Sequence, residues 1–351
     1  MLQDTLHPIV FEDIHDIISS DLDWGKFRNK TILISGANGF LATYMVYTLL
    51  LLNDERDINC KVIGIARNED RVKARFGDLT SRDDFQIIIS DVSEPIKISE
   101  KINFIIHAAS QASPKYYGVD PVGTLNANVL GTNNLLKLAL QNMVEGFLFF
   151  SSSEVYGNVS DDKIPTSESD YGYLDCMNVR SCYAEGKRMG ETMCISWMSQ
   201  FKVPVSIVRP FHTYGPGMLL DDGRVYADFI ADIVAGRNIV MRSDGSAMRS
   251  FCYLKDATKG FFRVLMNGKP GEAFNVGNPQ GETSIINLAE KLVSLFPEKK
   301  LKVIRKENQP DGYINSIVQR NCPDTSKIAL LGWNPETGIE SGFKRTVESY
   351  L

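Results

Sequence analysis

Several patterns that mark large classes of protein are missing from this sequence of 351 residues. It has four histidines, and its six cysteines form no C-x-x-C pair and no His–Cys spacing typical of a zinc site. Lysine and arginine number 38 against 43 acidic residues, and the two signs are mixed along the chain, so no basic stripe favours nucleic acid. We therefore expect reduced thiols, no metal, no nucleic-acid partner and small-molecule chemistry. The cysteines are Cys60, Cys176, Cys182, Cys194, Cys252 and Cys322.

Long apolar runs are equally scarce. The best candidate for a membrane span, around residues 44–52, is too short to cross a bilayer. The first segment, MLQDTLHPIVFEDIHDII, is acidic and amphipathic and has neither the basic start nor the apolar run of a signal peptide. We therefore expect a cytoplasmic protein without membrane contact.

What the sequence does contain is a regular alternation of short apolar, β-branched runs with helical segments. Such alternation is typical of βαβ units, and hence of an α/β fold with a parallel sheet covered by helices on both faces. One helix start is well marked, because Asp120 suits the N-cap and Pro121 the first helical position. The expected strands are 31–35, 61–66, 85–90, 104–109, 147–153 and 205–210, and the expected helices include one after Gly39 and one over 183–200.

The pattern changes after residue 210. The stretch TYGPGMLLDDGR is rich in glycine, proline and aspartate, as expected of a loop that shapes a site. Short helices such as 284–296 and short strands such as 301–304 follow, which indicates a smaller α+β domain. We expect a helical extension over 1–30, a dinucleotide-binding domain over 31–210, and a mainly substrate-binding domain over 211–351 with some segments returning to the first sheet.

A glycine-rich turn, GANGFLA, directly follows the first expected strand and opens a helix. Glycines let the backbone turn tightly and approach a pyrophosphate, and the helix N-terminus offers free N–H groups. A tight strand-to-helix turn without a ligand is the alternative. This position predicts a Rossmann-type, doubly wound sheet in which cofactor contacts come from Gly36, Asn38, Gly39, Phe40 and Leu41.

The choice of cofactor depends on Arg67, which follows the second expected strand. A site that prefers NAD usually has an acidic residue there, hydrogen-bonded to the ribose. Arg67 could instead pair with the 2′-phosphate of NADP, stack on adenine, or lie solvated at the surface. The first of these favours NADP on physical grounds, so the residues alone leave both NAD and NADP possible.

Tyr183 and Lys187 lie four residues apart, on one face of an expected helix. A free phenol titrates near pH ~10, so an adjacent ammonium that stabilises phenolate is needed for it to act as a base near neutrality. Tyr-x-x-x-Lys alone is common on protein surfaces. Its place after the strand FLFFSSS predicts a catalytic pair.

Ser152, Ser153 and Glu154 follow that same strand. The carboxyl edge of an open parallel sheet faces the ligand crevice, so these side chains are candidates for substrate contact. The alternative is a serine-rich turn with an exposed glutamate. Arg249 could clamp a phosphate or carboxylate or form a structural salt bridge.

Read together, these motifs resemble those of the extended short-chain dehydrogenase/reductases that modify nucleotide sugars, the NAD-dependent epimerase/dehydratase family. The likeness covers nearly all of the chain after residue 30, and within the family it is greatest to the UDP-glucuronate decarboxylases. The motifs are GANGFLA, Asp91-Val92, HAAS, NANVLGTNNLL, SSSEVYG, RSCYAEGKRMGET, RPFHTYGPGM, GSAMRSFCYLKD and CPDTSKIALLGWNP.

The resemblance implies a tightly held, recycled NAD, a nucleotide-sugar substrate, and a homodimer formed through 121–141 and 183–200. Catalytic roles pass to Ser152, Ser153, Glu154, Tyr183 and Lys187. Further cofactor contacts are implied for Arg67, Asp91, Val92, Ala108, Ala109, Ser110, Asn128, Tyr183, Lys187 and Pro210. Substrate contacts are implied for Ser110, His212, Arg224, Arg249 and Arg320.

The expected reaction is decarboxylation of a nucleotide-linked glucuronate after transient oxidation at C4. A 4,6-dehydratase or an epimerase is the alternative enzyme, and a catalytically idle dinucleotide-binding regulator is the alternative outside enzymes. The chain departs from the family at His212, usually Asn, at Ser152, usually Thr, and at Arg67, usually acidic.

Overall fold

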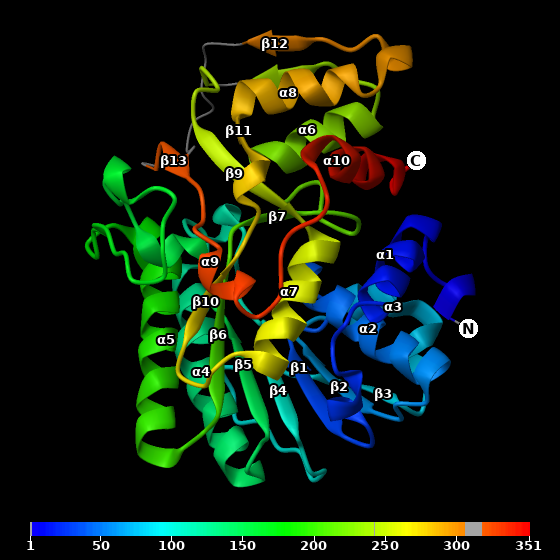
Figure 1. The fold of residues 1–351 in the computed structure, drawn as a ribbon, viewed down its shortest axis with the longest axis vertical. Helices are drawn as coiled ribbons and strands as arrows, with labels where there is room; N and C mark the ends of the chain where they lie inside the picture. The colour runs from blue at the N-terminus through cyan, green and yellow to red at the C-terminus, as the bar shows by residue number, and fades with distance from the viewer. Residues whose placement is uncertain (1, 242, 306–317) are drawn as a thin grey trace.

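The computed structural model describes residues 2–241, 243–305 and 318–351. Its centre is a seven-stranded sheet in which every recorded strand pair is parallel, in the order β10-β6-β5-β4-β1-β2-β3 (Figure 1). The doubly wound parallel sheet predicted from the sequence is therefore confirmed. The strands are β1 (Thr31–Ser35), β2 (Lys61–Ala66), β3 (Phe85–Ile89), β4 (Phe104–His107), β5 (Gly146–Phe150), β6 (Val205–Pro210) and β10 (Ala273–Val276).

Helices cover both faces of this sheet because its strands are apolar on both sides. In β1, Ile32 and Ile34 pack against residues of α2 and α7, whereas Leu33 between them packs against residues of α4 and α5. Successive strand side chains point to opposite faces, so an unbroken apolar run has to be covered twice. The covering helices are α2 (Phe40–Arg56), α4 (Pro121–Asn142), α5 (Cys182–Phe201) and α7 (Leu254–Asn267), with α3 (Glu69–Phe76) beside β2 and β3.

Helix α4 begins as the sequence predicts. The carboxylate of Asp120 accepts a hydrogen bond from Gly123 N, and Pro121 occupies the first helical position. Three expected strands end earlier than predicted, because residues 90, 108–109 and 151–153 leave the sheet at its carboxyl edge. The strand order reverses between β1 and β4, and in open parallel sheets the ligand crevice lies at such a point, outside the carboxyl ends of the strands.

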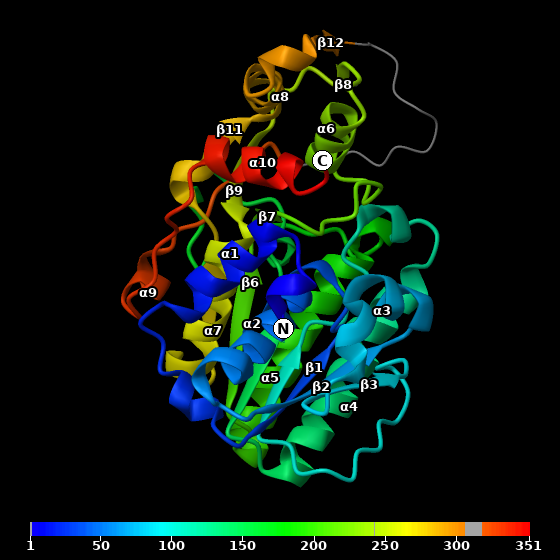
Figure 2. The ribbon, with the colours of Figure 1, turned by 90° about the vertical axis from the view of Figure 1, so that its right-hand side faces the viewer.

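The smaller part of the fold lies beyond the carboxyl edge of the main sheet (Figure 2). Its aromatic core includes Tyr214, Phe251 and Phe343, and the Tyr214 and Phe343 rings stack 3.8 Å apart. Segments after residue 210 also return to the main sheet as β10 and α7. The remaining elements are β7 (His212–Tyr214), α6 (Val225–Val234), β8 (Ile239–Met241), β9 (Met248–Tyr253), β11 (Glu282–Ser284), α8 (Ile285–Ser294), β12 (Val303–Arg305), β13 (Arg320–Asn321), α9 (Ser326–Ala329) and α10 (Ile339–Glu348).

The N-terminal segment forms α1 (Pro8–Ile18), which packs on α2 and α7. Its buried Asp13 accepts hydrogen bonds from Tyr44 on α2 (3.1 Å), Tyr253 on β9 (2.7 Å) and Arg345 on α10 (2.8 Å). The first residues of the chain therefore connect the main sheet's helices to the smaller part. No helix within the described ranges is both long and apolar enough to cross a membrane.

Candidate active site

The glycine-rich turn lies between β1 and α2. Gly36 has a φ of +66°, and a Cβ there would approach Ala109 Cα to 2.7 Å. Only glycine combines this backbone conformation with such close packing. Gly39 is the N-cap of α2 and has no side chain to bond the first N–H groups, which stay available to an anion. This turn fits the pyrophosphate of a dinucleotide.

The opposite wall of the crevice follows β4. His107 has both ring nitrogens engaged, with Ser35 Oγ at 2.8 Å and Thr132 Oγ1 at 3.0 Å, so its role is structural. Ser110 Oγ, by contrast, is buried without a hydrogen-bond partner among the described residues. Buried polar atoms normally have partners, so a free hydroxyl in the crevice is suited to a ligand.

Two further buried oxygens lack partners within the described ranges, and both belong to neighbouring elements. Asn128 on α4 donates through Nδ2 to Thr124 O, while its Oδ1 is unpaired. Ser151 Oγ, just after β5, is unpaired as well. Together with Ser110 they make a set of hydrogen-bonding groups at the carboxyl ends of β4 and β5. The residues present therefore fit a dinucleotide.

Tyr183 and Lys187 lie in the first two turns of α5, and both are buried. Lys187 Nζ lies 5.9 Å from the centre of the Tyr183 ring and donates a 2.6 Å hydrogen bond to Phe150 O, at the end of β5. Burial lowers the pKa of Lys187 to about 7. Lys187 therefore contacts the carboxyl end of β5, and Tyr183 lies one turn before it on α5.

Four other side chains set the environment of the Tyr183 phenol. Burial raises its pKa, whereas a hydrogen bond with Ser152 and the charge of Arg224 act in the opposite direction. The Tyr117 ring stacks on the Tyr183 ring with centres 5.2 Å apart. Ser152 is thus in direct contact with the candidate base, and Glu154 is close enough to raise the phenol's pKa. Ser153 is buried in the same turn.

Arg67 lies after β2 and forms an ion pair with Asp91, with Nη1 3.5 Å from Oδ2. Asp91 follows β3, and its Oδ1 also accepts hydrogen bonds from Ser93 N (2.8 Å) and Ser93 Oγ (2.7 Å). Partial burial opposes ionisation of Asp91, but these hydrogen bonds and Arg67 hold its pKa below the usual value. The two residues that the sequence assigned to the adenosine end of the cofactor are therefore partners of each other. Val92 next to them packs against Gly131 of α4.

On the substrate side, Arg224 precedes α6 and donates to Ala112 O at 2.9 Å, while it pairs with Asp222 at 2.7 Å. This places a guanidinium near Tyr183. His212 lies on β7, and its Nδ1 is buried with no partner in the described part of the chain. Burial and the charges of Arg249 and Arg224 hold the pKa of His212 well below its usual value, so the ring is neutral near pH 7.

The other two expected substrate arginines are engaged elsewhere in the smaller part. Arg249 on β9 donates to the carbonyl oxygens of Met248 (2.8 Å), Val318 (2.8 Å) and Gln319 (3.1 Å). Arg320 on β13 forms a two-bond ion pair with Glu282, at 2.7 and 2.9 Å. Pro210 ends β6. The structure brings Ser152, Tyr183 and Arg224 together. The guanidinium of Arg320, in contrast, is already occupied by its ion pair with Glu282.

Sequence reasoning missed Tyr117, which no motif marks. It missed as well the buried network around Arg209 on β6, which donates to both carboxylate oxygens of Glu191 on α5, at 2.8 and 2.7 Å. Arg209 Nη1 also donates to Tyr156 Oη at 3.0 Å. This network holds α5 and the SSSEVYG turn in register with the sheet. A charged residue in the apolar run VSIVRP was the one available signal.

This architecture is that of a dinucleotide-dependent enzyme of the extended short-chain dehydrogenase/reductase type. The sequence matches the NAD dependent epimerase/dehydratase family over residues 32–277. The chain belongs to that family, which confirms the resemblance seen in its motifs.

Named relatives agree with this placement. UDP-glucuronic acid decarboxylase 6 of Arabidopsis thaliana is 35% identical over 324 residues, which are 92% of this chain and 89% of the relative. UDP-glucuronic acid decarboxylase 1 of Xenopus tropicalis is 34% identical over 322 residues, covering 92% of this chain and 72% of the relative.

A solved structure of similar fold is the UDP-glucuronic acid 4-epimerase from Bacillus cereus in complex with UDP-glucuronic acid and NAD. It has a TM-score of 0.75 at 22% identity, over 91% of this chain and 98% of that chain. At this identity the likeness supports the shared fold, which is the one described above.

Proposed function

We propose that this protein decarboxylates UDP-glucuronate to a UDP-pentose and uses NAD as a cofactor that each turnover regenerates. The observation that carries the choice of substrate is the 35% identity, over 92% of the chain, to a UDP-glucuronic acid decarboxylase. The described geometry supports the reaction type, because a phenol, a hydroxyl and an arginine meet beside a crevice suited to a dinucleotide.

The reaction begins with removal of the C4 hydroxyl proton by Tyr183. NAD held in the crevice beside C4 would supply the hydride acceptor for this oxidation and the hydride donor for the later reduction. Ser152 orients the phenol and lowers its pKa, and the C4 ketone that forms is β to the C6 carboxylate. Carbon dioxide can then leave because its bonding electrons are delocalised into the ketone. Protonation at C5, return of the hydride to C4 and return of the proton from Tyr183 to the C4 oxygen would complete the pentose, while the enzyme contributes orientation and placed charge.

The cofactor would be held by both walls of the crevice. The Gly36 turn and the N-terminus of α2 suit the pyrophosphate, and Ser110, Asn128 and Lys187 offer donors and acceptors deeper in the site. Lys187 would exchange its hydrogen bond to Phe150 O for the ribose. Arg67 is partly neutralised by Asp91, so we propose NAD as the main cofactor, with NADP bound more weakly.

Cationic groups near the Tyr183 phenol suit a substrate with a diphosphate and a carboxylate. Arg224 lies near the phenol, and Arg249 lies near His212. We propose that Arg224 and Arg249 hold these anionic groups, with Ser153 and Glu154 beside C4 to C6 of the sugar. Arg320 would take part only if it exchanged Glu282 for the substrate.

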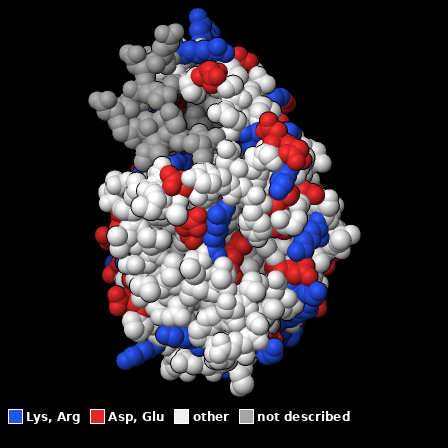
Figure 3. All heavy atoms as spheres, turned by 90° about the vertical axis from the view of Figure 1, so that its left-hand side faces the viewer, with Lys and Arg blue, Asp and Glu red and all other residues white. Residues whose placement is uncertain are grey.

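We also propose that two chains associate through α4 and α5. Both helices carry exposed apolar side chains, among them Leu130 (47% exposed) and Met189 (49% exposed). The side of the molecule on which α5 lies shows a mostly uncharged lower surface in Figure 3. Free thiols at all six cysteines suit the cytoplasm, which we propose as the location.

The test is incubation of the purified protein with UDP-glucuronate, UDP-glucose, GDP-mannose and dTDP-glucose, followed by mass spectrometry. Loss of carbon dioxide from UDP-glucuronate is the expected result. Loss of water from a hexose substrate would identify a 4,6-dehydratase, and an isomer of unchanged mass would identify an epimerase. Absence of turnover with every substrate would leave the idle dinucleotide-binding regulator.

A further inference from the structure

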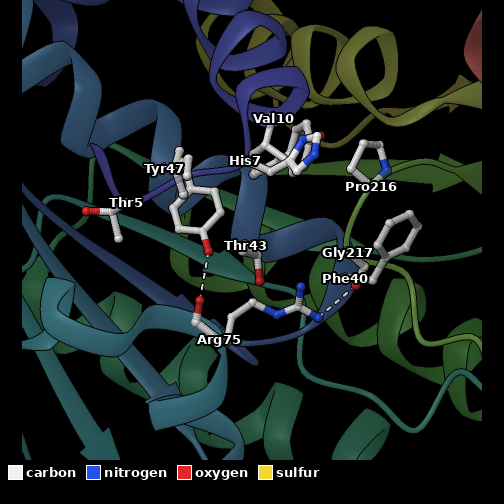
Figure 4. Close-up of a pocket in the computed structure, with 11 residues that line it drawn as sticks. Thr5, His7, Val10, Phe40, Thr43, Tyr47, Arg75, Pro216 and Gly217 are labelled. Atoms are coloured by element: carbon white, nitrogen blue, oxygen red, sulfur yellow. Dashed lines mark hydrogen bonds between the residues drawn. The ribbon is translucent and has the colours of Figure 1, made fainter. Parts of the chain in front are cut away.

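A pocket of about 150 Å³ lies outside the crevice, between the N-terminal segment, α2, α3 and the loop after β7. Its walls include Thr5 and His7 before α1, Phe40 and Tyr47 on α2, and Arg75 on α3, and Figure 4 shows His7 and Arg75 facing the pocket from opposite sides. At ~30 Å³ per water molecule, the volume holds about five waters or one small polyatomic ion. It is too small for a nucleotide sugar or a dinucleotide.

The charges of the described lining are of one sign. Arg75 is the charged side chain of this pocket, and no aspartate or glutamate is among its described lining residues. Within the described ranges the guanidinium donates only through Nη2, to Gly217 O at 2.8 Å. Its Nη1 and Nε therefore remain available, and a partly buried guanidinium with free donors favours a carboxylate or phosphate.

The second donor is His7. Its Nδ1 accepts a hydrogen bond from Ile9 N (3.2 Å), which caps the first turn of α1. With Nδ1 as acceptor, the proton of the neutral ring is on Nε2, which can donate to a ligand. His7 and Val10 both line the pocket, so the positive end of the helix dipole of α1 adds to the same field.

We propose that this pocket binds a small oxyanion, either a phosphate or the carboxylate of a small acid, between Arg75 and His7. Such a ligand would touch the cofactor turn from its far side. Phe40, a wall of the pocket, is the first residue of α2, and Thr43 Oγ1 in the same wall donates to Gly39 O at 2.8 Å. The ligand would join the N-terminal segment to the dinucleotide turn.

Thermal unfolding in inorganic phosphate tests this site independently of the sugar substrate. The protein is first saturated with NAD and UDP, so that the crevice is filled, and phosphate is compared with chloride at equal ionic strength. The expected result is a saturable rise in Tm, on the order of 3 °C when phosphate is about tenfold above its Kd. Acetate in place of phosphate distinguishes a carboxylate site from a phosphate site.

Three variants of the lining residues and one control variant show which side chains bind the phosphate. Arg75→Gln should remove the phosphate-dependent rise, and Arg75→Lys should keep part of it, because a cation remains even if the bond to Gly217 is weakened. His7→Asn keeps a side-chain cap for α1 but removes the ring donor, so it should reduce the rise. Arg71→Gln, on the same helix but outside the pocket lining, should leave it unchanged.

An equal rise in the wild type and in Arg75→Gln would overturn the proposal, as would the same Tm in phosphate, acetate and chloride. Neither result bears on UDP-glucuronate turnover, so failure of this site and failure of the proposed function are separate outcomes.

Discussion

Ser152 lies beside the phenol of Tyr183, and its hydroxyl acts to lower the pKa of a phenol that burial raises. The Tyr–Lys spacing alone assigned that influence to Lys187. In the structure Lys187 Nζ donates a hydrogen bond to Phe150 O. The groups that lower the pKa of the phenol are Ser152 and Arg224.

Ser152→Ala should therefore lower kcat. In the pH–rate profile, the increase in rate that accompanies deprotonation of Tyr183 should move to higher pH. Loss of a hydrogen bond of roughly 1.4 kcal/mol corresponds to about a tenfold lower rate. Ser152→Thr is the matched control, since it keeps the hydroxyl and should keep the profile. An unchanged pH profile in Ser152→Ala would show that the hydroxyl does not act on the phenol.

Stability at different pH values tests the buried state of Lys187. Its pKa is about 7 in the folded protein and ~10.4 in an unfolded chain, so between these values the unfolded state binds more protons and stability rises with pH. Below pH ~7 both states are protonated and the full cost of burying the charge is present.

The change of Lys187→Met removes this titration while keeping a long side chain. The free energy of unfolding of the wild type should gain about 3.5 kcal/mol relative to Lys187→Met between pH 7 and pH 10, as measured by urea unfolding at several pH values. A constant difference between the two proteins over that range would contradict a neutral buried lysine.

Asp91→Asn probes the ion pair at the adenosine end of the cofactor site. Removing the carboxylate charge frees Arg67, so NADP should bind more tightly in the variant, while the affinity for NAD changes less. Calorimetric titration with both cofactors measures this change. If the NADP affinity stayed the same, Arg67 would lie outside reach of the 2′-phosphate.

Leu130→Glu places a charge on the exposed apolar surface of α4 and should convert a dimer into a monomer in sedimentation experiments. Leu330→Glu is a matched control on another surface, where a leucine is 87% exposed. A dimer that survives Leu130→Glu, or that dissociates equally in both variants, would place the interface elsewhere.

Local pattern predicted much of this fold. The strands 31–35, 61–66 and 205–210 have the bounds expected from their β-branched runs, and Asp120 caps α4 as its sequence indicates. Such features depend on residues that are close together in the chain, so they can be predicted from a single sequence.

Contacts between distant segments could not be predicted in the same way. Asp13 meets Arg345 from the other end of the chain, and Tyr117 stacks on Tyr183, although neither pair has a spacing that marks it. The partners of Arg67 and Arg320 are likewise set by which loops meet in the folded protein.

The most direct test of the central claim uses UDP-glucuronate with deuterium at C4. Oxidation at C4 on a cofactor that stays bound predicts that the wild type releases carbon dioxide and returns the deuterium to C4 of the pentose, whereas Tyr183→Phe binds NAD but loses turnover by about 10²–10⁴-fold. Near-normal turnover in Tyr183→Phe, or a pentose whose C4 deuterium has exchanged with water, would contradict the account.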